Sequence, residues 1–172
     1  GYNIAKDYAR TNFQNAHFIP VEHHNAHAAS TFLVSPFPES AVLTVDLIGD
    51  WDTTRFYNGK GNAIEKIGVI EFPNSVGKLY QMFTKFLGFA PNSDEYKVMG
   101  LAAYGTDRLV PFFDTLYTLT PDGGFKLNKD KLLFCKGIRP EWDEQITAVL
   151  GSPRKKDEPI NQNHRDIAYA LQ

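Results

Sequence analysis

The chain has 172 residues, which is enough for one domain with its own core and too few for two domains of ordinary size. Hydrophobic residues make up 42%, charged residues 22%, and the formal net charge is -2. This balance excludes an intrinsically disordered chain and provides no electrostatic attraction to nucleic acid, so no nucleic-acid partner is expected.

The single cysteine and the absence of long apolar runs indicate the cellular compartment. Cys135 has no second cysteine to pair with, and no apolar run approaches the roughly 20 residues that span a bilayer. We therefore expect a cytoplasmic protein with no membrane partner. Because the start, Gly1 to Lys6, has neither an initiator methionine nor the apolar core of a signal peptide, we also expect the true N-terminus to lie upstream.

The first part of the chain predicts an antiparallel meander preceded by helices. Helices are expected at 4–13 and 22–33, an extended run at 17–21, and strands at 41–46, 53–57 and 64–70. The second helix is rich in alanine and ends before Ser35-Pro36, where proline disfavours helical geometry. Turn residues between the three strands make successive antiparallel pairing the simplest arrangement.

From Ser75 onward the apolar period changes from two to 3.6. Helices are expected at 75–87, 94–103, 107–119 and 141–150 and from 164, with a turn at 121–124, a short strand at 125–127 and a polar link at 152–163. Strands followed by helices predict an α/β class in which helices cover one face of a mixed sheet.

Two histidines one helical turn apart form the first candidate site. Because positions i and i+4 lie on one helix face, the imidazoles of His23 and His27 can converge on one metal ion. On spacing alone, two histidines four residues apart are more often surface or packing residues than ligands. In the zinc-protease pattern H-E-x-x-H a glutamate follows the first histidine, but here His24 holds that place, so proteolysis is disfavoured and His24 is expected to face a neighbouring loop.

Asp46 ends the most apolar strand and is the second candidate ligand. It can complete a metal site with the two imidazoles, hold a cation bound to nucleotide phosphates, or simply initiate a turn. Asp50 and Asp52 fit the turn interpretation better than Asp46 does.

The segment from Asp94 to Gly105 mixes charges with small residues. Lys97 can neutralise a phosphate or carbamoyl oxygen, and Glu95 can accept a proton from a hydroxyl. The same segment can equally be a helix with a charged first turn and a small-residue face packed on the sheet. We expect it to line the same cleft as the histidine pair.

The segment from Phe72 to Tyr80 predicts a helix N-terminus. Asn74 or Ser75 can cap it, and its free amides, around Ser75 and Gly77, form a candidate contact for an anionic cofactor, although ordinary capping also explains the pattern.

Residues 21–30, 72–80 and 94–105 together resemble, in the right order, the carbamoyltransferase family that includes the nodulation and cephamycin O-carbamoyltransferases. The resemblance runs from about Ile19 to Gly105, and residues 164–172 resemble the family's next helix. It implies part of a ribonuclease-H-like, actin-like ATPase fold, similar to that of the threonylcarbamoyl-transfer proteins. Residues 1–172 would then be part of the N-terminal domain, without the rest of that domain and without the C-terminal adenylate-forming domain of the same chain.

The resemblance also implies a chemistry. His23, His27 and Asp46 would hold a divalent iron, zinc or manganese ion, while the family's fourth ligand, a far-downstream aspartate, has no match in these residues. Carbamoyl phosphate and ATP would be the substrates of the whole enzyme, and a small-molecule hydroxyl, on a sugar or natural product, would be the acceptor. This chain by itself is expected to be inactive.

Two alternatives stay open. One is carbamoyl transfer to another acceptor, as in transfer-RNA threonylcarbamoylation or hydrogenase maturation. The other is a non-catalytic actin-like ATP-binding domain, which would have no use for a three-ligand metal site.

Overall fold

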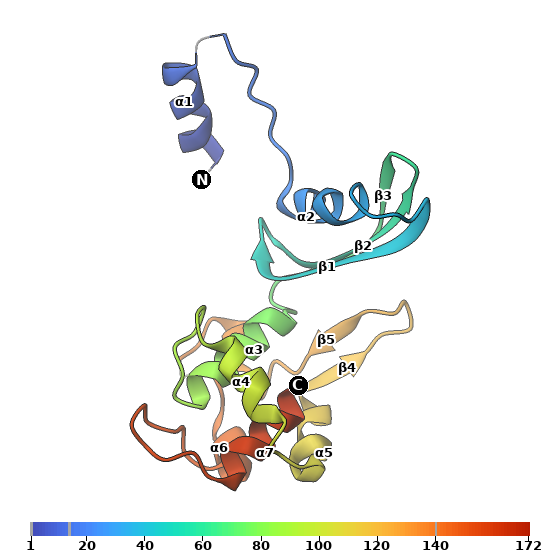
Figure 1. The fold of residues 1–172 in the computed structure, drawn as a ribbon. Helices are drawn as coiled ribbons and strands as arrows, with labels where there is room; N and C mark the ends of the chain where they lie inside the picture. The colour runs from blue at the N-terminus through green and yellow to red at the C-terminus, as the bar shows by residue number, and fades with distance from the viewer. Residues whose placement is uncertain (1, 14, 140) are drawn as a thin grey trace.

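The computed structural model describes residues 2–13, 15–139 and 141–172 and contains two layers (Figure 1). A small sheet with one helix on its outer face lies above a body of helices, and the first helix, α1 (Tyr2–Asn12), stands apart on an extended segment. No helix among the described residues is both long and apolar enough to cross a membrane.

The sheet contains β1 (Glu39–Gly49), β2 (Asp52–Lys60) and β3 (Ala63–Glu71) in that order, antiparallel throughout. Tight turns join the strands at Asp50 and Gly61, each with a φ of 59°, a left-handed conformation that suits aspartate and glycine. The arrangement confirms the predicted α/β class and the antiparallel meander, and fits part of a ribonuclease-H-like, actin-like fold.

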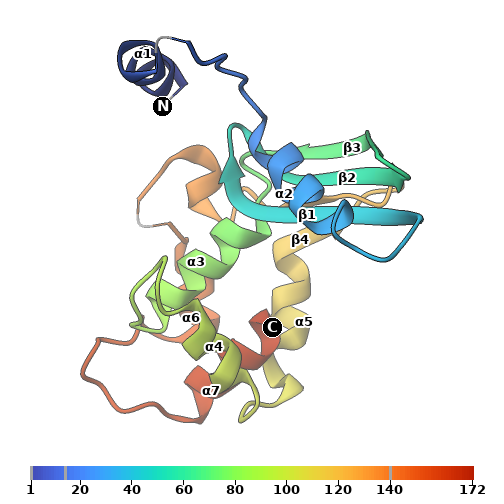
Figure 2. The ribbon, with the colours of Figure 1, turned by 45° about the horizontal axis from the view of Figure 1, so that its top comes forward.

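Helix α2 (His23–Phe32) covers one face of this sheet (Figure 2). A small apolar cluster joins them, formed by Ala28 and Phe32 of the helix and Val42 and Tyr57 of the strands. A Cβ atom at Gly59 would lie 2.8 Å from the Phe32 ring, which explains a glycine within β2. The helix therefore sits directly on the backbone of the sheet.

The helical body surrounds a second and larger apolar cluster. Its elements are α3 (Val76–Phe86), α4 (Glu95–Ala102), α5 (Val110–Phe113), α6 (Glu144–Leu150), α7 (Gln162–Leu171), the 3-10 turns at 107–109, 114–116 and 133–136, and the hairpin of β4 (Tyr117–Leu119) and β5 (Phe125–Leu127). The core includes Met82, Phe83, Phe86, Leu116 and Ile167, none more than 1% exposed.

Part of the predicted helix at 107–119 is wrong. Only Val110–Phe113 is α-helical, and Tyr117–Leu119 forms a strand that pairs with Phe125–Leu127. The turn around Gly123, whose φ is 83°, brings the two short strands together, and their pairing outweighs local helix preference. The helix predicted at 141–150 begins later, at Glu144, where the Asp143 side chain accepts a hydrogen bond from the Ile146 amide.

Asp166 joins α7 to the loop that follows α4. Its carboxylate accepts hydrogen bonds from the Thr106 amide and hydroxyl, both at 3.0 Å, from Arg108 Nε at 2.8 Å and from Gln162 Nε2 at 2.9 Å. Burial works to raise the pKa of Asp166, but these donors outweigh it and lower the pKa to about 2. The carboxylate is therefore charged and fully paired in the folded chain.

We predict that Asp166→Asn destabilises the chain at pH 7 by on the order of 1–3 kcal/mol, because Arg108 loses its buried partner. The native pKa lies below the ordinary value of 3.8, so the wild-type advantage is present above about pH 4 and lost as the pH falls toward 2. Urea unfolding followed by circular dichroism across this range measures the difference. Asp130→Asn, which removes an exposed partner of Lys136, is the control and should leave stability unchanged. A wild-type advantage that persists at pH 2 would contradict the prediction.

Candidate metal centre

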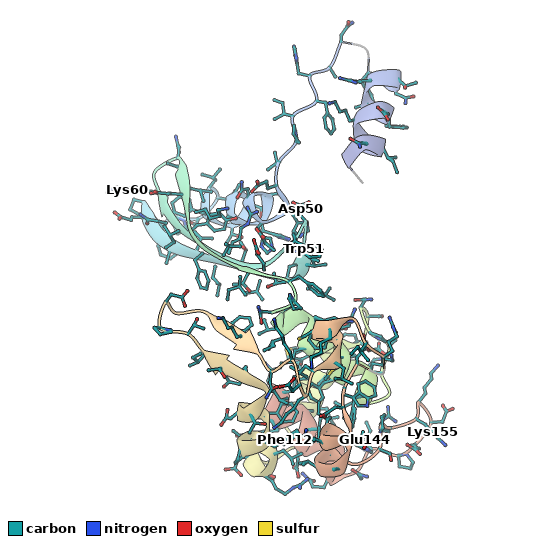
Figure 3. The ribbon with its side chains drawn as sticks, turned by 180° about the vertical axis from the view of Figure 1, so that it is seen from behind. Asp50, Trp51, Lys60, Phe112, Glu144 and Lys155 are labelled. Atoms are coloured by element: carbon teal, nitrogen blue, oxygen red, sulfur yellow. The ribbon has the colours of Figure 1, made fainter. Side chains whose placement is uncertain are left out.

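Helix α2 presents two histidines at the end of the sheet. Its first turn is held by the β1–β2 turn, because Asp50 Oδ2 accepts a hydrogen bond from the His23 amide at 3.1 Å. Figure 3 shows Asp50 and Trp51 at this end of the sheet, beside α2, with Lys60 at the opposite end. His23 and His27, one turn apart, bring their Nε2 atoms to 3.0 Å from each other.

Asp46 completes the group from β1. The strand changes register between Val45 and Gly49, and Asp46 lies within this irregular stretch. Its Oδ2 is 2.6 Å from His23 Nε2 and 3.4 Å from His27 Nε2, while Oδ1 accepts a hydrogen bond from the Leu47 amide at 2.7 Å. The structure thus brings together the three residues that the sequence predicted as ligands.

The donor set fits a divalent metal ion. All three ligand atoms lie within 4.8 Å of one another. Around a tetrahedral zinc ion with bonds of about 2.0–2.2 Å, ligand atoms lie about 3.3–3.6 Å apart. The distances of His27 Nε2 from His23 Nε2 and from Asp46 Oδ2, 3.0 and 3.4 Å, are close to this, whereas His23 and Asp46 are at a hydrogen-bond distance of 2.6 Å. The side chains of His23, His27 and Asp46 are 43%, 54% and 32% exposed, so the group is open on one side. An open side is what a catalytic metal site needs to admit a substrate.

The electrostatics keep Asp46 ionised. Partial burial works to raise its pKa, but the hydrogen bonds from His23 and the Leu47 amide, together with the charges of His23 and His27, lower it below its ordinary value of 3.8. A charged carboxylate is the form that binds a cation.

Ser75 and Gly77, at the start of α3, lie against the backbone of β1 at Asp46 and Leu47. The Ser75 hydroxyl accepts from the Lys78 amide at 2.9 Å and donates to the Leu47 carbonyl at 2.7 Å, so it both caps α3 and ties the helix to the end of β1. A Cβ at Gly77 would lie 2.8 Å from Leu47 Cα. The cofactor contact predicted here stays a prediction, and an anion at this N-terminus would have to bind backbone amides, since the hydroxyl is already used.

The structure does not bring Glu95 and Lys97 to the histidines. Lys97 Nζ pairs with Asp94 at 2.8 Å, which raises the pKa of the lysine, and Glu95 accepts from the Asn92 amide at 2.7 Å. Both contacts are local to the start of α4.

Helix α4 itself lies in the helical body, whereas α2 lies on the outer face of the sheet (Figure 1). The end of α4 packs on α7. A Cβ at Gly105, just after α4, would lie only 2.2 Å from the Arg165 carbonyl oxygen and would overlap it. Packing thus accounts for this glycine, and the expectation that residues 94–105 line the same cleft as His23 and His27 finds no support in the described residues.

Two buried residues beside the histidines were not predicted as part of the site. His24 does not face a loop, because its Nδ1 is 2.8 Å from Thr44 Oγ1 and its Nε2 is 3.1 Å from the Asp52 carbonyl oxygen, both in the sheet. Arg55 of β2, 5% exposed, pairs with Glu22 and Asp52. The signal in the sequence that could have identified Arg55 is a charged side chain at a strand position that faces a covering helix and not solvent.

Comparison with known proteins identifies the family. Residues 5–172 match the family described as Carbamoyltransferase N-terminus. The chain belongs to this family. It is 42% identical over 153 residues to an uncharacterized protein of Synechocystis sp., a match that covers 88% of this chain and 25% of the relative.

Two nodulation proteins are also similar. The chain is 34% identical to nodulation protein NolNO of Sinorhizobium fredii and 36% identical to nodulation protein NolO of Bradyrhizobium diazoefficiens, over 88% of its length in each case. These matches cover 21% and 26% of the two relatives. The chain therefore spans about a quarter or less of the length of these relatives.

The close approach at Gly77 generates a stability prediction. Gly77→Ala should destabilise the chain by about 1–3 kcal/mol, because the added methyl group meets the backbone of Leu47 and forces α3 away from β1. Gly100→Ala is the matched control, since nothing lies within 4 Å of its Cβ position in α4, and it should stabilise the helix by up to about 1 kcal/mol. Thermal unfolding of both variants measures this. Equal stability of the two would contradict the packing argument.

The ligand geometry generates a binding prediction. Replacing His23, His27 or Asp46 singly with alanine should weaken Zn²⁺ binding by more than about 100-fold, since even residues that only support ligands are worth about 10–100-fold. Calorimetric titration with Zn²⁺, Mn²⁺ and Fe²⁺ under anaerobic conditions measures the affinity. His17→Ala, at an exposed position outside the group, should leave binding unchanged. Unaltered affinity in the three ligand variants would refute the assignment.

Proposed function

We propose that this chain forms the metal-holding part of an O-carbamoyltransferase. The observation that carries the proposal is the convergence of His23, His27 and Asp46 in a chain that belongs to the carbamoyltransferase N-terminus family. The whole enzyme would transfer a carbamoyl group from carbamoyl phosphate, by way of carbamoyl adenylate, to a hydroxyl of a sugar or natural product.

The reaction that this assigns to the whole enzyme is an acyl-type transfer. The acceptor hydroxyl oxygen forms a bond to the carbamoyl carbon, and the bond from that carbon to the adenylate phosphate oxygen breaks, which releases AMP. The hydroxyl proton passes to a base. A divalent ion, when bound, would supply Lewis-acid polarisation of the carbamoyl carbonyl or of the adenylate phosphate.

The residues of this chain have separate tasks in the proposal. His23 and His27 contribute imidazole nitrogen ligands, and the Asp46 carboxylate contributes negative charge. Their exposed edges leave room for the substrate on the solvent side. Glu95 as proton acceptor and Lys97 as anion contact stay predictions, as do Ser75 and Gly77 as cofactor contacts.

The test uses the full-length O-carbamoyltransferase that the proposal assigns to this chain. Asp46→Asn should lower carbamoyl transfer to the hydroxyl acceptor by more than about 100-fold, because the charged ligand is lost. Consumption of ATP to form carbamoyl adenylate should stay within about twofold of wild type, because that step is assigned to another domain. Mass spectrometry of the acceptor measures transfer, and an assay of pyrophosphate release measures adenylate formation, because AMP leaves only in the transfer step.

Three outcomes are informative. Transfer lost with adenylate formation retained supports the proposal. Retained transfer overturns the catalytic role of the metal group, and an equal loss of both steps would mean that Asp46 acts on folding or on adenylate formation. Asn58→Ala, at an exposed position of β2, is the control for handling of the protein.

A further inference from the structure

The side of α2 opposite the solvent carries a polar network that the proposed ligands do not use. His24 is completely buried, and both of its ring nitrogens have partners in the sheet. The Asp52 carbonyl oxygen can only accept, so His24 Nε2 carries the hydrogen, and Nδ1 accepts from the Thr44 hydroxyl. The ring thereby spans β1 and β2 and fixes the helix to both.

Arg55 holds the same helix turn from β2. Its Nη1 donates to Glu22 Oε2 at 2.5 Å and to Asn25 Oδ1 at 3.1 Å, while Nε donates to Asp52. Tyr57 also donates to Asn25 Oδ1 at 2.9 Å. Glu22 is the N-cap of α2 and Asn25 lies in its first turn, so Arg55 and Tyr57 hold the start of the helix from β2.

The energetics suggest what this network is for. Buried ion pairs such as Arg55 with Asp52 contribute little net stability, since removing charges from water offsets their attraction, and apolar replacements are often equally stable. A network of directional hydrogen bonds does fix how the helix is rotated about its own axis, because any such rotation breaks all of these hydrogen bonds together.

Rotation is the quantity on which the ligand group depends. Side-chain atoms lie about 6 Å from a helix axis, so a rotation of about 20° moves them by about 2 Å, which equals a whole metal–ligand bond. The side chains of His23 and His27 are 43% and 54% exposed, and the His23 ring packs on the backbone at Gly49, so packing constrains the pair from one side only.

We propose that Arg55 and His24 are positioning residues for the ligand group: they fix the rotation of α2 so that His23 and His27 converge with Asp46. The inference rests on the proposed metal site. It assigns no contact with the ion to either residue.

The test compares variants of the full chain that weaken the network with one that weakens packing. Arg55→Lys keeps the charge but cannot donate to Glu22, Asn25 and Asp52 together, and His24→Leu removes both ring contacts. Each should weaken Zn²⁺ binding by about 10–100-fold and change the visible absorption spectrum of bound Co²⁺. Val42→Ala removes apolar packing between α2 and β1 and is the matched control. It should lower the Tm comparably while leaving Zn²⁺ affinity within about twofold of wild type.

A second measurement needs no metal. In crystal structures of metal-free His24→Leu and Arg55→Lys, the three ligand atoms, now within 4.8 Å of one another, should no longer converge. The positioning role is overturned if the three ligand atoms still converge in these two variants and their Zn²⁺ affinity is retained. It is also overturned if Val42→Ala loses Zn²⁺ affinity in proportion to its loss of Tm. If the wild type binds no Zn²⁺ while convergence is lost in the variants, the proposed metal function fails and the positioning role stands. If wild type binds no Zn²⁺ and convergence is retained, both are overturned.

Discussion

The end of β1 is the point on which both layers of the molecule depend. Gly49 and Gly77 allow this short stretch to be approached from two sides, since a Cβ at Gly49 would lie 2.4 Å from the His23 ring and one at Gly77 would lie 2.8 Å from Leu47. The first contact brings in α2 and the second brings in α3. Asp46 lies between them, so its position is set by two helices and its own strand. A carboxylate held in this way needs little reorganisation to bind a cation.

The sequence placed His23, His27 and Asp46 among the candidate ligands by two local rules, and the family resemblance then joined them into one predicted metal group. Helical spacing places His23 and His27 on one face, and Asp46 follows the apolar run of β1, which the structure extends to Gly49. That the strand end lies beside the helix is a tertiary fact, and only the family resemblance supplied it in advance. The meander was predictable for a similar reason, since turn residues separate three β-branched runs.

Other features could not be predicted from the sequence. His24 has both ring nitrogens bonded within the sheet, and neither partner is identifiable without the helix position. Alternation places Arg55 and Tyr57 on one face of β2, but does not say that α2 covers that face. Residues 117–119 continue the apolar pattern of the predicted helix, and only their pairing with 125–127 shows that they form a strand. The place of α4 depends on packing against α7 at Gly105, which no local pattern records.

The small size of the apolar cluster beneath α2 has a thermodynamic consequence. Four buried side chains join this helix to the sheet, whereas the helical body has a much larger core, so α2 is expected to open at a lower free energy than the body does. An ion held by two side chains of α2 and one of β1 would act as a cross-link across that weak junction. At a free ion concentration 100 times the Kd, mass action adds about 2.7 kcal/mol to the closed form. Occupancy of the site would then stabilise the closed position of α2 on the sheet and slow the local opening of the outer layer.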